Sequence, residues 1–192
     1  MFSVDKFPVL IITSPRCGSG AYGHQLAILN PNIRFFNEPN YDKTKLDEFL
    51  EYSKDNNYIL KILASSIKMF PEWYKKDIFK TDKIYTIKLQ RNNIIDQIAS
   101  HYVSEQRKKW HYIPKDNDDQ TYYNSLEIDI KAIDYSIEQI KFHNYLVQNT
   151  WTDKTIIYED FKDKLDPNLY VVKTLRPANY SDIVRIVRER YK

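Results

Sequence analysis

Glycine occurs at only three of the 192 positions, and these three, Gly18, Gly20 and Gly23, lie within six residues of one another. Average usage would place about 13 glycines in a chain of this length. Glycine adopts positive φ and lets a ligand approach the main chain, because it has no Cβ. A continuous apolar run of strand length, residues 8–13, precedes this window, and a helical pattern follows it to Leu29. The sequence therefore predicts one specialised turn between a buried strand and a helix.

Strand-like and helical segments alternate along the rest of the chain. Short apolar runs predict strands, and apolar residues spaced three and four apart predict helices. The predicted strands are 8–13, 33–36, 58–63, 83–89, 155–158 and 169–172, and helices are predicted up to 29 and at 43–54, 93–109, 126–147 and 181–191. Asn124 and Glu127 have the spacing of a capping box for the longest helix. We expect a single domain over residues 1–192 with a three-layer α/β fold, a mostly parallel central sheet flanked by helices.

Composition excludes several classes of protein. A hydrophobic content of 42% is too high for a disordered chain. The single cysteine, Cys17, excludes a disulfide framework, and four scattered histidines have no zinc-site spacing. We therefore expect no bound metal and a reducing, cytoplasmic compartment. No apolar run reaches about 18 residues, so we expect no membrane span. The net charge of +3 predicts a mild attraction to anions and does not by itself predict nucleic-acid binding.

The glycine window partly fits two other nucleotide-binding patterns. Residues 18–23 match the G-x-G-x-x-G fingerprint, and Glu38 follows at the distance of the carboxylate that binds ribose. This alternative predicts a NAD-binding Rossmann-type oxidoreductase. In that fold the strand runs almost directly into the first glycine, whereas residues 14–17 intervene here. A Walker A loop requires lysine and a hydroxyl residue where this chain has His24 and Gln25.

A third interpretation uses the whole segment Ser-Pro-Arg-Cys-Gly-Ser-Gly at residues 14–20. Such a turn directs backbone N–H groups to the N-terminus of the following helix, where the helix dipole favours an anion. Arg16 adds a permanent charge and a planar fork that fits phosphate oxygens, and Ser19 adds a hydroxyl donor. We therefore expect an anion-binding loop, in an enzyme or in a non-catalytic nucleotide-binding module.

The same segment resembles the 5′-phosphosulfate loop of the sulfotransferases that use 3′-phosphoadenosine 5′-phosphosulfate (PAPS). That loop commonly reads Pro, Lys or Arg, Ser, Gly, Ser or Thr, Thr. In this chain Cys17 stands in place of the serine, and Gly20 in place of the second hydroxyl residue. The resemblance implies a P-loop-NTPase-like fold and transfer of the sulfonate of PAPS to an acceptor hydroxyl, with PAP as product and no metal.

Residues 89–100 resemble the 3′-phosphate element of these enzymes, a strand-end arginine followed by a helix that carries a serine. The spacing of Arg91, Gln97 and Ser100 is most similar to bacterial carbohydrate sulfotransferases of the trehalose type. Three further segments match in order: Glu-Pro at 38–39, Trp-His at 110–111 and Tyr-Glu-Asp-Phe at 158–161. Together the matches span residues 8–161.

The resemblance assigns a role to individual residues. The 5′-phosphosulfate is assigned to Arg16, Cys17, Gly18, Ser19, Gly20 and Ala21. The 3′-phosphate is assigned to Arg91 and Ser100. Glu38 is the expected general base that removes the acceptor proton, as in the trehalose-type enzymes, and His111 or His101 are alternatives because other sulfotransferases use histidine.

The acceptor is expected to be a small molecule or glycan, a carbohydrate rather than a steroid or a protein. Lys61 lies inside an apolar strand and must reach either an anion or solvent, so we place it with Trp110 and His111 on the acceptor side. An acceptor-side loop is expected at 103–125. A late basic segment with Lys173 and Arg176 is expected to approach the 3′-phosphate.

Overall fold

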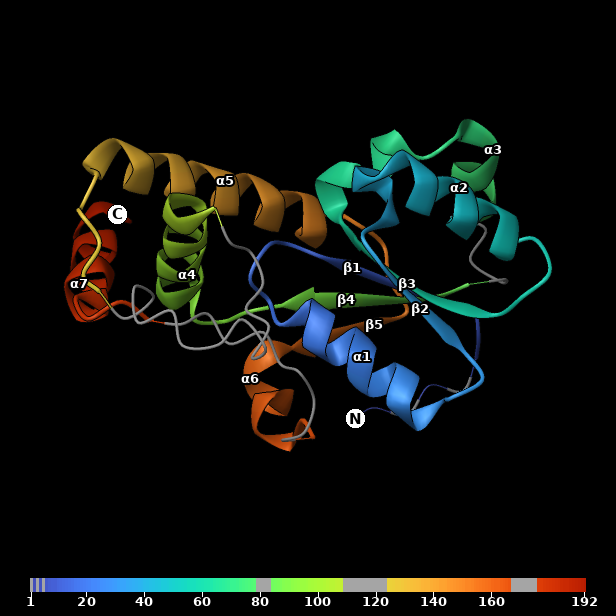
Figure 1. The fold of residues 1–192 in the computed structure, drawn as a ribbon. Helices are drawn as coiled ribbons and strands as arrows, with labels where there is room; N and C mark the ends of the chain where they lie inside the picture. The colour runs from blue at the N-terminus through green and yellow to red at the C-terminus, as the bar shows by residue number, and fades with distance from the viewer. Residues whose placement is uncertain (1, 3, 5, 79–83, 109–123, 167–175) are drawn as a thin grey trace.

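The computed structural model describes residues 2, 4, 6–78, 84–108, 124–166 and 176–192. Its centre is a sheet of five strands that run in the same direction (Figure 1). They are β1 (Val9–Thr13), β2 (Arg34–Asn37), β3 (Tyr58–Leu63), β4 (Tyr85–Gln90) and β5 (Lys154–Ile157). Their order is β2-β3-β1-β4-β5, so the first strand of the chain lies in the middle. The predicted α/β class and parallel sheet are confirmed.

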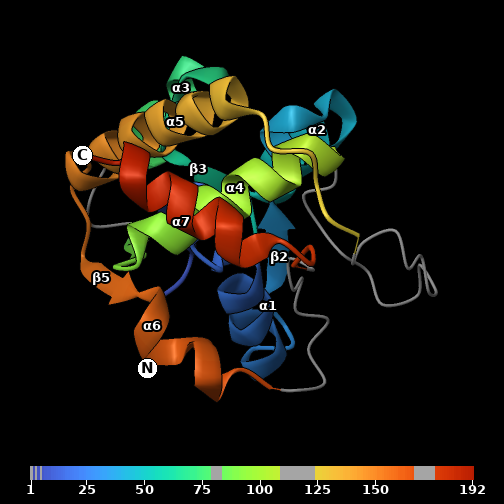
Figure 2. The ribbon, with the colours of Figure 1, turned by 90° about the vertical axis from the view of Figure 1, so that its left-hand side faces the viewer.

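Helices cover both faces of this sheet. One face carries α1 (Ser19–Leu29) and α6 (Tyr158–Phe161), and the other carries α2 (Lys43–Tyr52), α3 (Glu72–Ile78) and the end of α5 (Ile130–Gln148). The rest of α5 extends beyond the sheet and packs against α4 (Ile94–Arg107) and α7 (Tyr180–Arg190), as Figure 2 shows from the side. Short 3₁₀ helices follow β2, β3 and α6: η1 (Pro39–Tyr41), η2 (Ala64–Met69) and η4 (Lys162–Lys164).

Buried apolar side chains of the described residues form three clusters. Val9 and Ile11 of β1 belong to the cluster beneath α1 and α6, whereas Leu10 and Ile12 belong to the cluster beneath α2 and α3. This two-sided burial explains why the first strand is a continuous apolar run rather than an alternating one. The third cluster lies between α4, α5 and α7, with Tyr102 fully buried in it. It fixes these helices beside the sheet without contributing to either of its faces.

The longest helix begins later than its sequence pattern predicts. Its N-cap is Asp129, whose carboxylate accepts two backbone N–H bonds, and its first residue is Ile130. The predicted capping box of Asn124 and Glu127 is therefore wrong. The Tyr102 hydroxyl donates to the carbonyl of Glu127 at 2.9 Å and accepts from the N–H of Asp129 at 3.1 Å. These tertiary bonds engage the backbone groups that a longer helix would need.

Other sequence expectations differ in detail. Helix α3 was not predicted, since its seven residues are too few to display a helical period. Residues 103–107 belong to α4, so the acceptor-side loop predicted at 103–125 cannot include them. The predicted strand at 169–172 lies outside the described residues, as do residues 109–123 of the expected acceptor-side loop.

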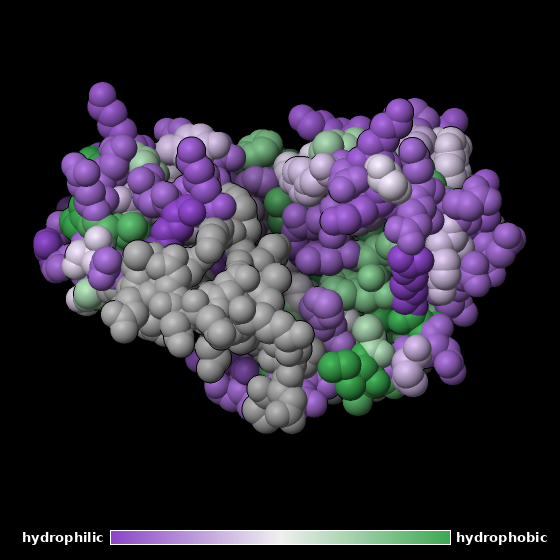
Figure 3. All heavy atoms as spheres, viewed as in Figure 1, coloured by the Kyte–Doolittle hydropathy of each residue, from purple (hydrophilic) through white to green (hydrophobic). Residues whose placement is uncertain are grey.

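The surface in Figure 3 is mainly hydrophilic, with apolar side chains gathered over α1. Ile28 and Leu29 of α1 are 52% and 54% exposed, which accounts for part of this patch. Within the described ranges, no helix has both the length and the apolar character needed to cross a membrane.

Candidate functional site

Most of the predicted site residues that the structure describes lie at or beside the edge of the sheet where its parallel strands end. The segment 14–18 follows β1, Glu38 follows β2, Arg91 follows β4 and Tyr158 follows β5. Ligands of open α/β sheets bind outside these carboxyl ends, at the point where the connections turn from one side of the sheet to the other. In the observed strand order this point lies between β1 and β4.

The turn between β1 and α1 has the geometry of an anion-binding loop. Arg16 and Gly18 both have left-handed backbone conformations, with φ of 63° and 69°. Left-handed residues that alternate with right-handed ones direct successive N–H groups into one concavity. Gly18 is the N-cap of α1 and has no side chain, so the N–H groups of Ser19, Gly20 and Ala21 have no acceptor in the helix or its cap, and Tyr22 is the first to donate within it, to the carbonyl of Gly18. These groups and the helix dipole favour an anion at this position.

The three glycines differ in what surrounds them. A Cβ at Gly18 would lie 2.5 Å from Cδ2 and Cε2 of the Tyr158 ring, whereas a Cβ at Gly20 would meet nothing within 4 Å. A Cβ at Gly23 would overlap the ring of Phe35. Gly18 is therefore required by backbone conformation and by space, Gly23 allows α1 to pack closely on β2, and Gly20 leaves open space at the helix N-terminus.

Gln97, on α4, holds the turn between β1 and α1 through its side-chain amide. Its amide nitrogen donates to Ser14 Oγ at 2.8 Å and to the carbonyl of Pro15 at 2.7 Å, and it lies 3.2 Å from Cys17 Sγ. Its amide oxygen accepts from Asn144 of α5 at 3.3 Å. Gln97 and Cys17 are fully buried, and burial raises the pKa of the Cys17 thiol. The Cys17 side chain is thus part of the support of the loop rather than of its ligand-facing side, and sequence reasoning assigned no role to Gln97.

Arg16 and Ser100, predicted on separate elements of the donor site, are in contact. Arg16 Nε donates to Ser100 Oγ at 3.0 Å, although 84 residues separate the two. Burial, with a smaller effect from the positive charge of Arg91, lowers the pKa of Arg16 to about 10. The Arg16 guanidinium therefore stays charged at neutral pH.

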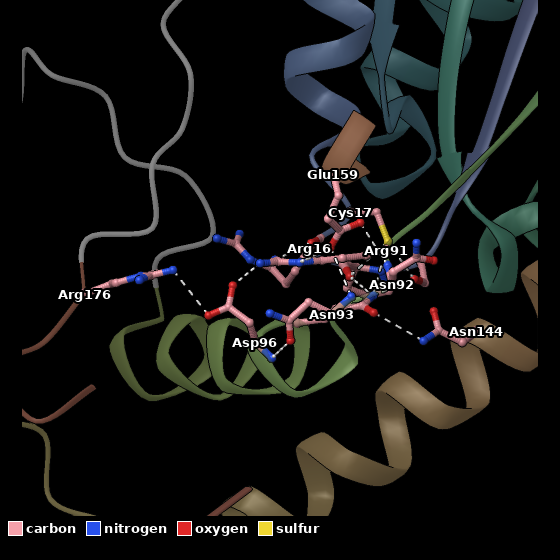
Figure 4. A network of polar contacts seen from close by, with 12 residues as sticks. Arg16, Cys17, Arg91, Asn92, Asn93, Asp96, Asn144, Glu159 and Arg176 are labelled. Carbon is pink, nitrogen blue, oxygen red and sulfur yellow. Dashed lines mark hydrogen bonds and ion pairs between the residues drawn. The ribbon is translucent and has the colours of Figure 1, made fainter. Parts of the chain in front are cut away.

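Arg91 lies beside the loop but is surrounded by protein groups. It donates to the carbonyl of Arg16 at 3.1 Å, and its guanidinium carbon lies 4.8 Å above the centre of the Tyr158 ring. It forms an ion pair with Asp96, and its Nε lies 3.8 Å from a carboxylate oxygen of Glu159 (Figure 4). Neither Asp96 nor Glu159 was part of the predicted site. Sequence spacing does not distinguish an arginine that binds a ligand anion from one that forms ion pairs within the protein.

Glu159 also caps the start of α4. Its two carboxylate oxygens each accept a backbone N–H, from Asn92 and Asn93, at 3.0 Å. Burial raises the pKa of Glu159, but these two bonds and the charge of Arg91 outweigh it and the pKa is lowered overall. This carboxylate is therefore ionised at neutral pH and ties the end of β4 to the end of β5.

Glu38 and Lys61 form an ion pair at the ends of β2 and β3. The Glu38 N–H donates to the carbonyl of Lys61 at 2.8 Å, and Glu38 itself has a left-handed backbone with φ of 51°. Lys61 is only 5% exposed. Burial, assisted by the charge of Arg16, lowers the pKa of Lys61 to about 7. A non-glycine residue held at positive φ costs about 1–3 kcal/mol and is typical of functional sites.

His101 is buried on α4, with Nδ1 3.2 Å from Ser136 Oγ of α5. Burial, together with the charges of His143 and Arg16, lowers the pKa of His101 to about 4, so its ring is neutral near pH 7. Trp110 and His111 lie outside the described residues. In the part of the chain that the structure describes, no three His, Cys, Asp or Glu side chains are grouped so as to hold a metal ion.

Fold and site together define an α/β protein whose loop between the central strand and the following helix has the geometry of an anion-binding turn, with two partly buried arginines and the Glu38–Lys61 pair close to it. No protein-family model matches the chain, and no curated protein matches it significantly.

Proposed function

We propose that this protein is a sulfotransferase with a P-loop-like fold, which transfers the sulfonate group of PAPS to a hydroxyl group of a carbohydrate acceptor. The proposal rests above all on the contact between Arg16 and Ser100. These residues belong to the two segments that resemble the 5′-phosphosulfate loop and the 3′-phosphate element. A donor with phosphate groups on the 3′ and 5′ positions of one ribose needs both elements side by side.

In the proposed reaction the acceptor oxygen attacks the sulfur atom in line with the bond from sulfur to the bridging oxygen. The new sulfur–oxygen bond forms, the bridging bond breaks, and its electron pair leaves with PAP. The backbone N–H groups from Gly18 to Ala21 and the Arg16 guanidinium stabilise the charge that develops on the departing oxygen. Catalysis of this kind depends on positioning and charge rather than on a covalent intermediate.

Glu38 accepts the proton that the acceptor hydroxyl loses. The neighbouring Lys61 ammonium favours the ionised form of this carboxylate, which is the form that can act as a base. The backbone bond from Glu38 to Lys61 fixes the position of the residue at the sheet edge. We therefore assign Glu38 as general base and Lys61 as the residue that orients it.

The Rossmann alternative is disfavoured by the strand order. In the dinucleotide-binding fold the first strand lies between the second and the fourth, in the order 3-2-1-4-5-6. Here β1 pairs with β3 and β4, and β2 is at the edge. The glycine fingerprint at residues 18–23 thus occurs on a different topology.

The donor is tested by measuring the melting temperature with PAP, NAD and ATP, each added to the full chain. A ligand at 100 times its Kd stabilises the folded state by about 2.7 kcal/mol. We expect PAP to raise the melting temperature and NAD and ATP to leave it unchanged. A shift with NAD and none with PAP would refute the proposal in favour of the oxidoreductase.

The catalytic assignment is tested with Glu38→Gln and PAPS carrying a labelled sulfonate, offered to a panel of sugars. General-base catalysis contributes about 10²–10⁴-fold, so we expect a loss of that size in turnover while PAP still raises the melting temperature. The matched control is Glu48→Gln, which removes an exposed carboxylate of α2 that pairs with Arg34. Normal turnover by Glu38→Gln would exclude Glu38 as the base, and PAP binding without transfer to any sugar would favour a non-catalytic nucleotide-binding module.

A further inference from the structure

Asp96 lies in the first turn of α4, and no sequence pattern predicted the polar contacts that its carboxylate makes. Its carboxylate forms ion pairs with Arg91 and, at 3.3 Å, with Arg176, and it accepts from the Tyr180 hydroxyl at 2.7 Å. The Asp96 side chain is 16% exposed and that of Arg91 is 12% exposed. Figure 4 shows Asp96 between Arg176 on one side and the arginines of the loop region on the other. An anionic group of α4 thus lies where positive charges from the end of β4 and from the segment before α7 meet.

This position matters because Arg91 is the residue assigned to the 3′-phosphate of the donor. Its guanidinium donates to the Arg16 carbonyl and to Asp96, and its face is covered by the Tyr158 ring. A phosphate that bound Arg91 would meet the carboxylate of Asp96 at close range, and two negative charges a few ångströms apart repel each other in a poorly solvated site. A 3′-phosphate and Asp96 therefore compete for the same cation.

We propose that Asp96 is a specificity-determining residue of the nucleotide site: its carboxylate occupies Arg91 and Arg176 in the free protein, and a 3′-phosphate binds by displacing it. This inference rests on the proposed function, since it assumes that the donor carries a 3′-phosphate. A nucleotide with a free 3′-hydroxyl has no charge with which to displace Asp96, and it leaves the ion pairs intact.

The displacement has a consequence that can be measured. A 3′-phosphate must replace existing ion pairs, so its net gain over a hydroxyl is smaller than a free arginine would provide. Asparagine at position 96 keeps the size of the side chain and removes the charge. We expect Asp96→Asn to bind PAP at least about tenfold more tightly, which corresponds to about 1.4 kcal/mol, and to bind 5′-AMP with unchanged affinity.

The experiment is calorimetric titration of the full chain with PAP and with 5′-AMP. Tyr180→Phe is the second variant, because it removes the hydroxyl that donates to Asp96 while all charges remain, and we expect a smaller rise in PAP affinity in the same direction. Asp182→Asn is the control, since it removes an exposed carboxylate in the first turn of α7, and its PAP affinity is expected to stay within twofold.

Each outcome decides between specific alternatives. If both nucleotides weaken equally in Asp96→Asn, Asp96 only supports the fold and the inference is wrong. If the wild-type chain binds PAP and neither Asp96→Asn nor Tyr180→Phe changes the ratio of PAP to 5′-AMP affinity, Asp96 does not compete with the phosphate. If the wild-type chain and Asp96→Asn both fail to bind PAP, the proposed function itself fails, together with this inference.

Discussion

Replacing the three glycines one at a time by alanine tests whether they differ as their surroundings predict. At Gly18 the substitution has two penalties. A left-handed backbone costs an L-residue about 1–2 kcal/mol. The new Cβ would also lie 2.5 Å from the Tyr158 ring, and overpacking of this kind typically costs about 1–3 kcal/mol. The ring has little freedom to move, because Arg91 lies over one face and Phe161 contacts it edge-on, with centroids 5.5 Å apart.

For Gly18→Ala we therefore expect a loss of about 2–5 kcal/mol in the free energy of unfolding, the sum of these two penalties. Gly20→Ala is the matched control. A Cβ at position 20 would meet nothing within 4 Å. Alanine has fewer conformations than glycine in the unfolded chain, so we expect the free energy of unfolding to rise by about 0.4–1 kcal/mol. Gly23→Ala should fall between them, with a loss of about 1–3 kcal/mol from contact with Phe35.

Guanidinium unfolding followed by circular dichroism measures all three free energies, and the values are comparable if the slope with denaturant stays constant. The decisive quantity is the difference between Gly18→Ala and Gly20→Ala. If the two variants differ by less than about 0.5 kcal/mol, within the range of ordinary surface substitutions, the left-handed turn and the Tyr158 contact do not determine the loop.

Three further predictions concern Gln97, His101 and Asp129, and each is tested by denaturant unfolding of the variants named here. Gln97→Leu leaves Ser14 Oγ and the Pro15 carbonyl without their buried donor, and we expect it to lower the free energy of unfolding by about 2–4 kcal/mol. Asn144→Ala removes one bond at 3.3 Å, and we expect a loss of about 0.5–1.5 kcal/mol. Equal losses would contradict a role for Gln97 in holding the loop. Burial lowers the pKa of His101 from 6.5 to about 4, so the unfolded state takes up the proton first and stability falls as pH drops from 6.5 toward 4. His101→Asn cannot titrate and should flatten this part of the stability curve, and an unchanged slope would mean that His101 is not buried in its neutral form. Asp129→Ala should lose about 1 kcal/mol as the cap of α5, and Asn124→Ala should change stability by less than about 0.5 kcal/mol; the reverse order would restore the capping box.

The parallel sheet was predictable because its signals are local. The strand at 8–13 is apolar on both faces, and Gly18 and Arg16 mark the turn that follows it. The start of α5 was not predictable, because Asn124 and Asp129 are both residue types that cap helices, and the choice depends on the Tyr102 hydroxyl of α4. Local propensity favours either start, and tertiary hydrogen bonds select one.

The candidate site was likewise predictable only where its signals are local. The turn that holds Arg16 was identified from its residues, and Arg91 and Ser100 were identified from the resemblance to sulfotransferases; in the structure Arg16 contacts both. The acidic partners of Arg91 were not identified, because Asp96 lies on its helix as an ordinary first-turn carboxylate and its contact with Tyr180 spans 84 residues. Ion pairs between distant segments have no signature in the sequence.

The central position of β1 has a consequence for how the chain is made. Val9 pairs with Ile59 on one side and with Tyr85 on the other. The first strand of this sheet to be synthesised therefore has no strand to pair with until β3 and β4 have followed it. Until Tyr85 emerges, one edge of an apolar strand stays unpaired, and such edges pair readily with other chains. Parallel strands far apart in sequence also close slowly, because loop entropy must be overcome before they gain contacts. Premature termination between β3 and β4 should therefore give an aggregating fragment, and the nascent chain is most vulnerable at the segment on which the finished sheet is centred.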